Sequence, residues 1–92
     1  MFGLSNETYK MIINIVKKYE CNFILFGSRA RGDYKANSDI DIAIENVKEE
    51  DIYSIRNDFD LLDIPYTLDL VFIKKDTKKE LLVSIKKEGV KL

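Results

Sequence analysis

Apolar residues recur along this chain with two different spacings, and each spacing predicts a different kind of element. Spacings of three and four residues predict helices, whereas strict alternation or a short apolar run predicts strands. Helices are expected over residues 5–19, 48–63 and 77–87. Strands are expected over residues 22–27, 39–45 and 66–73, with a short last strand over 90–92. A tight turn or one helical turn at 28–32 and a polar loop at 33–38 separate the first two strands.

Local signals place several of the helix ends. Ser5 can cap the first helix, and Pro65 follows the second helix as a stop. Thr77 and Glu80 have the spacing of a capping box, which places the start of the last helix at Thr77. Gly89 is expected to end that helix. Helices that alternate with strands predict one small α/β (α+β) domain over residues 1–92, with helices packed on the sheet.

Composition excludes several kinds of chemistry. The chain has 92 residues, 46% of them hydrophobic, so one ordinary core can form, but an enclosed second substrate pocket is not expected. The net charge of −1 argues against direct nucleic-acid binding. With no histidine and one cysteine, Cys21, the chain lacks an imidazole base and the usual zinc ligands. We expect a cytoplasmic protein, because the sequence shows neither a signal-peptide pattern nor a membrane-length apolar run.

Three aspartates are the strongest candidates for catalysis and metal binding. Asp39 and Asp41 lie two residues apart on a predicted strand, so their side chains share one face with Cα atoms about 7 Å apart. Asp69 interrupts the apolar run of the strand over 66–73. If the two strands are neighbours, the three carboxylates meet and can hold Mg²⁺. For Asp39 and Asp41 the alternative is two exposed aspartates at the entry of a strand, or one that caps the loop. For Asp69 the alternative is an edge strand from which it faces solvent.

A second pair with the same spacing provides a comparison. Asp58 and Asp60 lie on a predicted helix, where positions two apart point in different directions. We therefore expect this pair to be ordinary helix surface, with Phe59 between them in the core.

The turn after the first strand is a candidate phosphate site. Gly27 allows close approach of an anion, and Ser28 adds a hydroxyl donor beside the free N–H groups of the turn. The chain has twelve lysines and three arginines, yet Arg29 and Arg31 both fall in this turn. We predict that they contact phosphate, because guanidinium groups bind phosphate through two parallel hydrogen bonds. The alternative is a plain turn with a local ion pair.

Together these residues resemble the nucleotidyltransferase superfamily that includes DNA polymerase β-like enzymes. The shared pattern is Gly27-Ser28, ten intervening residues, and then Asp39-Ile40-Asp41. The longer form, Gly-Ser-Arg-Ala-Arg-Gly followed by Ser-Asp-Ile-Asp, is similar to the minimal nucleotidyltransferases of prokaryotes. The resemblance covers most of the chain and implies a small nucleotidyltransferase fold with a mixed sheet.

The resemblance also implies a role for each motif residue. Gly27 and Ser28 would bind the terminal phosphates of ATP, with weaker support for Arg29 and Arg31. Asp39, Asp41 and Asp69 would be the catalytic residues and would hold two Mg²⁺ ions. The hydroxyl of an acceptor would attack the α-phosphate, with pyrophosphate leaving.

Stand-alone enzymes of this kind are often antitoxins, and the resemblance implies a HEPN-domain ribonuclease toxin as partner. The AMP would then go to a tyrosine of that toxin. Two alternatives stay open: an antitoxin that binds without chemistry, and a nucleotidyltransferase subunit that modifies a small molecule or an RNA end. The sequence does not fix whether the chain also associates with copies of itself.

Overall fold

A computed structural model describes all of residues 1–92. It contains four helices and four strands, in the order that the sequence predicts. The helices are α1 (Asn6–Val16), α2 (Ser28–Arg31), α3 (Glu49–Asp60) and α4 (Lys79–Glu88). The strands are β1 (Asn22–Phe26), β2 (Ile40–Glu45), β3 (Leu68–Phe72) and β4 (Val90–Lys91). No helix is long and apolar enough to cross a membrane.

The strands form one mixed sheet in the order β3-β2-β1-β4. β2 pairs antiparallel with β1 and parallel with β3, and β4 pairs antiparallel with the other side of β1. The register places Asp41 opposite Phe26 on β1 and opposite Asp69 on β3. The predicted fold class, a mixed sheet covered by helices, is therefore confirmed.

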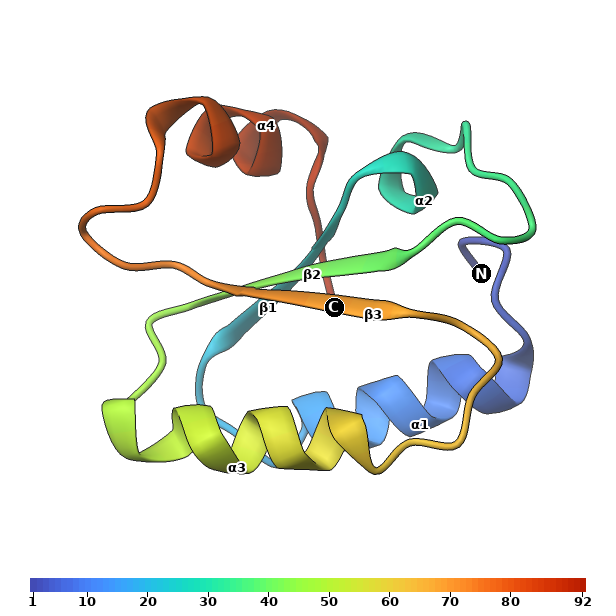
Figure 1. Ribbon diagram of the computed structural model, residues 1–92, viewed down its shortest axis with the longest axis horizontal. Helices are drawn as coiled ribbons and strands as arrows, with labels where there is room; N and C mark the ends of the chain where they lie inside the picture. Colours follow the sequence, from blue (N-terminus) through green and yellow to red (C-terminus); the bar gives the residue numbers. More distant parts are fainter.

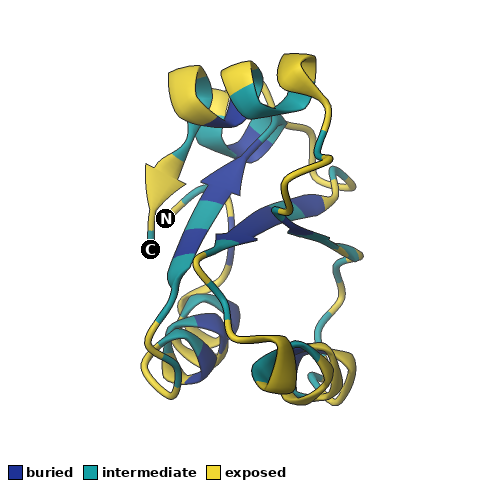
Figure 2. Cartoon of the chain, turned by 90° about the vertical axis from the view of Figure 1, so that its left-hand side faces the viewer, coloured by how far each residue is buried: buried dark blue, intermediate teal, exposed yellow.

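Helices cover both faces of this sheet. Figure 1 shows α1 and α3 on one side of the sheet, and α2 and α4 on the other. Figure 2 shows that the buried residues lie in the strands and on the inner faces of the helices, while the outer helix faces are exposed. Alternation along β2 explains the two layers: Ile40, Ile42 and Ile44 face α1 and α3, and Ala43 faces α4.

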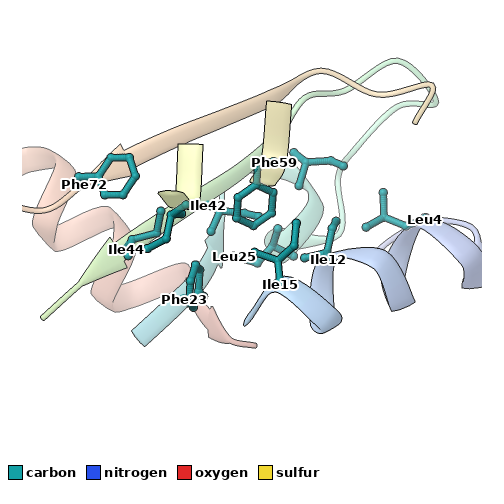
Figure 3. Close-up of a cluster of buried hydrophobic side chains, with 11 residues drawn as sticks. Leu4, Ile12, Ile15, Phe23, Leu25, Ile42, Ile44, Phe59 and Phe72 are labelled. Carbon is teal, nitrogen blue, oxygen red and sulfur yellow. The ribbon is translucent and has the colours of Figure 1, made fainter. Parts of the chain in front are cut away.

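The larger core lies between the sheet and the pair α1 and α3. Figure 3 shows Ile12, Ile15 and Phe59 from these helices converging on the sheet residues Ile42 and Ile44. The three isoleucines of β2 are 0% exposed, and burial of each such side chain contributes about 1.5–3 kcal/mol. The full cluster comprises Leu4, Ile12, Ile15, Phe23, Leu25, Ile40, Ile42, Ile44, Ile55, Phe59 and Phe72. This layer holds β2 rigidly, and β2 carries Asp41.

Helix α1 begins as predicted but ends earlier. The Ser5 hydroxyl accepts a hydrogen bond from the Thr8 N–H at 3.2 Å and so caps the helix. The helix ends at Val16 rather than at residue 19, and Tyr19 lies in the turn that follows. There its hydroxyl donates a 2.6 Å hydrogen bond to Asp58 of α3. Asp58 is thus a structural residue and not merely helix surface, while Phe59 is buried as predicted.

The predicted capping box at the start of the last helix is wrong. Lys78 is the N-cap of α4, and no side chain caps it. The Thr77 hydroxyl instead accepts a 2.8 Å hydrogen bond from the Lys74 N–H, closing the turn before the helix. Gly89 ends α4 as expected. A Cβ at this position would meet Ile85 O and Ile24 Cγ2, so the chain can turn into β4 here only with glycine.

Candidate active site

Three segments that carry the predicted site residues meet at one end of the sheet. β1 ends at Phe26, directly before Gly27 and Ser28, and its antiparallel partner β2 begins there with Ile40. β3, parallel to β2, begins at the same end with Leu68. In Figure 1, α2 and the loop that leads into β2 lie together above this end. The topology therefore brings together Gly27, Ser28, Asp39, Asp41 and Asp69.

Gly27 lies against the carboxylate of Asp41. Its φ of 75° and ψ of −159° belong to a region that only glycine adopts readily. A Cβ at Gly27 would collide with Asp41 Oδ2 and would lie 3.2 Å from Asp41 Cγ. The hydrogen bonds of the short helix α2 begin with the Arg31 N–H, so the earlier amides of the turn have no intrahelical partner. A compact group that carries negative charge can thus approach the backbone here, next to a carboxylate.

Asp41 is the half-buried member of the three aspartates. Burial, followed by the nearby charges of Asp69 and Asp39, raises its pKa above the ordinary value of 3.8. Arg31 opposes this effect and lowers the pKa. A carboxylate held partly out of water beside two others favours a bound cation, because a cation relieves both the desolvation and the repulsion.

Asp69 and Asp39 are both exposed. β3 is an edge strand, so for Asp69 the structure shows the alternative of an exposed aspartate on an edge strand. Strand parity nevertheless places it on the same face as Asp41, since Leu68, Leu70 and Phe72 pack into the opposite layer. No three acidic side chains lie close enough to form a closed set of metal ligands. The carboxylates of Asp39, Asp41 and Asp69 thus lie on neighbouring segments, but their oxygens do not converge on one point.

Arg29 does not occupy the predicted position beside a phosphate. It is 2% exposed, and its guanidinium donates hydrogen bonds to three backbone carbonyls. The rings of Tyr34 and Tyr66 lie on it, with centroids 5.2 and 4.9 Å from Cζ. The structure thus does not support a phosphate contact for Arg29. Sequence spacing gave no indication of Tyr66, because the contact depends on how the strands pair.

Arg31 is exposed and engaged in ion pairs. It donates to Glu88 of α4 at 2.9 Å and to Asp33 at 3.2 Å. The hydrogen bond to Glu88 is the main cause that raises the pKa of Arg31. Both partners are acidic side chains at the surface, so an incoming phosphate can compete with them. Glu88, which the sequence reasoning did not single out, therefore competes, together with Asp33, with any phosphate that binds Arg31.

The candidate site is open to solvent. The largest cavity, about 480 Å³, lies between α4 and the other end of the sheet, next to Asn22 and Glu45. Gly27, Ser28, Asp39 and Asp41 line none of the cavities, whereas Asp69 lies at the wall of one of about 330 Å³ between β3 and α3.

Solved structures of two other proteins share this fold. One belongs to a toxin–antitoxin crystal structure with AMP-PNP; it is 24% identical, with a TM-score of 0.65 over 95% of this chain and 72% of that chain. The other is a candidate nucleotidyltransferase from Sulfolobus solfataricus; it is 21% identical, with a TM-score of 0.52 over 91% of this chain and 74% of that one. At these identities the likeness concerns the fold. No curated protein matches the sequence.

A family model provides the direct assignment. The model described as "Polymerase beta, Nucleotidyltransferase" matches residues 10–92, which include every motif residue discussed above. The chain therefore belongs to the polymerase beta nucleotidyltransferase family.

Proposed function

We propose that this protein transfers AMP from ATP to a hydroxyl group of a partner protein, in a reaction that depends on Mg²⁺. The observation that carries the proposal is the contact of Gly27 with the carboxylate of Asp41, which lies in register with Asp69. Because Gly27 has no Cβ, the turn proposed to bind phosphate can lie directly against the carboxylate of Asp41, which is proposed to bind metal. Nucleotidyl transfer requires both groups at one point.

The donor set suits Mg²⁺. Asp39, Asp41 and Asp69 supply carboxylate oxygens, and Mg²⁺ in nucleotide enzymes is commonly held by one or two carboxylates together with phosphate oxygens and water. Two Mg²⁺ ions, when bound, would neutralise the triphosphate and make the attacking hydroxyl more acidic. The separation of the carboxylates in the structure fits a site in which the nucleotide supplies part of the ligand set.

The residues of the chain then have distinct tasks. The backbone of Gly27 and the Ser28 hydroxyl hold the terminal phosphates, and Arg31 adds charge once it leaves its ion pairs. Asp41 fixes the position of the nucleotide, because the core holds its strand. An Asp69 carboxylate oxygen accepts the proton of the acceptor hydroxyl. The acceptor oxygen then forms a bond to the α-phosphorus, and the bond to the departing pyrophosphate breaks.

The open surface favours an acceptor that belongs to another macromolecule. No cavity adjoins Gly27 and Asp41, so only the surface of a partner could shield the reaction from water. The fold shared with a chain of a toxin–antitoxin structure supports a toxin as this partner. We infer that a tyrosine of a HEPN-domain toxin receives the AMP, as the resemblance to minimal nucleotidyltransferases implies.

Two measurements test the proposal. Calorimetric titration with AMP-PNP and MgCl₂ should show binding by the wild-type chain, strongly weakened binding by Asp41→Asn, and unchanged binding by Asp76→Asn. Asp76 is the matched control, because it is an exposed aspartate in the turn after β3 that lines no cavity and that no side chain contacts by hydrogen bond or ion pair. Intact-mass spectrometry of a co-expressed toxin should show added AMP only when Asp41 is intact.

The outcomes separate the alternatives. Failure of the wild-type chain to bind AMP-PNP with Mg²⁺ would rule out the enzymatic function. An unmodified toxin that the Asp41→Asn variant still neutralises would identify an antitoxin that acts by binding alone.

A further inference from the structure

The largest fully buried side chain of this protein is a charged one, Arg29. Nε and Nη2 both donate to Ser38 O, at 3.1 and 2.9 Å, and Nη2 also donates to Ala36 O at 3.3 Å. Nη1 donates to Phe2 O at 3.0 Å. No acidic side chain forms a salt bridge with it. The buried charge is stabilised by carbonyl dipoles and by the faces of two tyrosine rings.

These contacts join the three segments that carry the candidate site. Arg29 itself follows Ser28 in α2, and Ser38, whose carbonyl it holds twice, directly precedes Asp39. Tyr66, stacked on the guanidinium, lies just before β3 and Asp69. The next residue, Thr67, accepts a 2.8 Å hydrogen bond from the Ile40 N–H and so links the entry of β3 to β2. One side chain therefore fixes the turn, the loop and the edge strand relative to one another.

Stability alone does not account for an arginine in this position. A buried charge is costly to desolvate, and a well-packed apolar side chain of similar volume commonly stabilises a fold as well or better. A lysine, which the chain uses at twelve other positions, carries no planar fork of donors that can hold three carbonyls while it also contacts two tyrosine rings. The geometry requires a flat group with several donors, which points to a need for fixed relative positions.

We propose that Arg29 is the positioning residue of the active site, and this rests on the proposed nucleotidyl transfer. It holds the Ser38 carbonyl and the ring of Tyr66, and it thereby places Asp39 and Asp69 beside Asp41. The side chains of Asp39 and Asp69 are exposed and form no hydrogen bond or salt bridge, so their place depends on the backbone that carries them. Pairing of β3 with β2 holds the backbone at Asp69, and the contacts of Arg29 with Ser38 and Tyr66 hold the segments that lead into both strands. Residues that orient metal ligands in this indirect way commonly change metal affinity about 10- to 100-fold when they are replaced.

The test compares Arg29→Lys with the matched control Arg56→Lys. Arg56 also lies over an aromatic ring, that of Phe72 at 4.8 Å, but it is exposed and donates no hydrogen bond. The first readout is amide hydrogen exchange without metal or nucleotide. The Ser38 N–H bonds Lys35 O at 3.0 Å and the Ile40 N–H bonds Thr67 O, and both should exchange about tenfold faster in Arg29→Lys. The second readout is the Mg²⁺ concentration needed for half-maximal AMP-PNP binding, which should rise about 10- to 100-fold.

Each outcome decides the matter. Faster exchange together with a higher Mg²⁺ requirement, both absent in Arg56→Lys, supports the positioning role. Faster exchange with an unchanged Mg²⁺ requirement overturns it, because Arg29 would then serve the fold alone. Unchanged exchange also overturns it. If the wild-type chain binds no AMP-PNP, the proposed function fails and this inference fails with it. If the wild-type chain binds AMP-PNP and Arg29→Lys binds it with the same Mg²⁺ requirement, this inference alone is overturned.

A second variant applies if Arg29→Lys does not fold. Tyr66→Leu removes one ring from the guanidinium and leaves the hydrogen bonds to Phe2, Ala36 and Ser38 in place. It should give a few-fold higher Mg²⁺ requirement and faster exchange of the Ile40 N–H. Wild-type values for both quantities in Tyr66→Leu would overturn the proposal.

Discussion

Replacement of Gly27 by alanine should impair nucleotide binding far more than it impairs folding. Two costs arise at this position. The backbone conformation, with φ of 75° and ψ of −159°, costs a residue with a Cβ about 1–3 kcal/mol. The new methyl group would also displace the carboxylate of Asp41, whose Cγ would lie only 3.2 Å away. For a domain of this size we expect the melting temperature to fall by about 4–8 °C for each kcal/mol lost.

Gly32→Ala is the matched control. Gly32 also has a positive φ, 95°, but a Cβ there would meet nothing within 4 Å. The left-handed conformation costs alanine about 1–2 kcal/mol, so this variant should lose stability without any change at Asp41. Comparison of the two variants separates backbone strain from displacement of the carboxylate.

The assay combines thermal unfolding with titration by AMP-PNP and MgCl₂, and with the rate of AMP transfer to the toxin. In Gly27→Ala we expect transfer to fall about 100-fold, the usual effect of moving a reacting group by about 1 Å. Gly32→Ala should retain wild-type binding at temperatures below its melting transition. Wild-type nucleotide affinity in Gly27→Ala would refute the reasoning, because the gap beside Asp41 would then have no role in binding.

Three further predictions concern titration and ion pairs. Since burial and neighbouring carboxylates raise the pKa of Asp41 above 3.8, the wild-type free energy of unfolding should fall as the pH rises from about 3.8 through the folded-state pKa. Urea unfolding of Asp41→Asn should lack this fall, and identical pH profiles for the two proteins would contradict the pKa argument. Tyr19→Phe removes the 2.6 Å hydrogen bond to Asp58 and should cost about 1.5 kcal/mol in urea unfolding without changing AMP-PNP binding. This hydrogen bond is the main cause that lowers the pKa of Asp58, so its contribution to the free energy of unfolding should vanish as the pH falls below 3.8 through the folded-state pKa. A contribution that does not change with pH would exclude the ionised carboxylate of Asp58 as the acceptor. Glu88→Gln should weaken one of the two ion pairs of Arg31 and strengthen AMP-PNP binding a few-fold at low salt; unchanged binding would show that this ion pair does not restrain a contact between Arg31 and the nucleotide.

The sequence was sufficient to predict the faces of β2. Alternation of Ile40, Ile42 and Ile44 with the aspartates determines which side chains enter the core, because the side-chain period of a strand is two. It also placed Asp39 and Asp41 on one face. The sequence did not predict that β2 pairs with β3, because nothing in either strand specifies its neighbour; the meeting of the three aspartates was expected only if the two strands were neighbours. The register of Asp41 opposite Asp69 is a property of the assembled sheet.

The errors have local physical causes. Thr77 has the spacing of a capping residue, but its hydroxyl bonds Lys74, an alternative that threonine commonly offers the backbone. Arg29 was assigned to phosphate because its motif and the scarcity of arginine suggested it. Arg29 instead donates to the backbone carbonyls of Phe2 and Ser38. Every residue has such a carbonyl, so the spacing of residue types along the sequence cannot identify these partners.

The buried guanidinium also limits how the length of this chain can change during evolution. Ala36 and Ser38 must both reach the side chain of Arg29, so an insertion or deletion after Ala36 would break these contacts. Variation in length is tolerable only in the exposed stretch at 33–35. The contacts of Arg29 thus fix the segment that leads into Asp39, while the exposed stretch at 33–35 is where the number of residues between Ser28 and Asp39 can change.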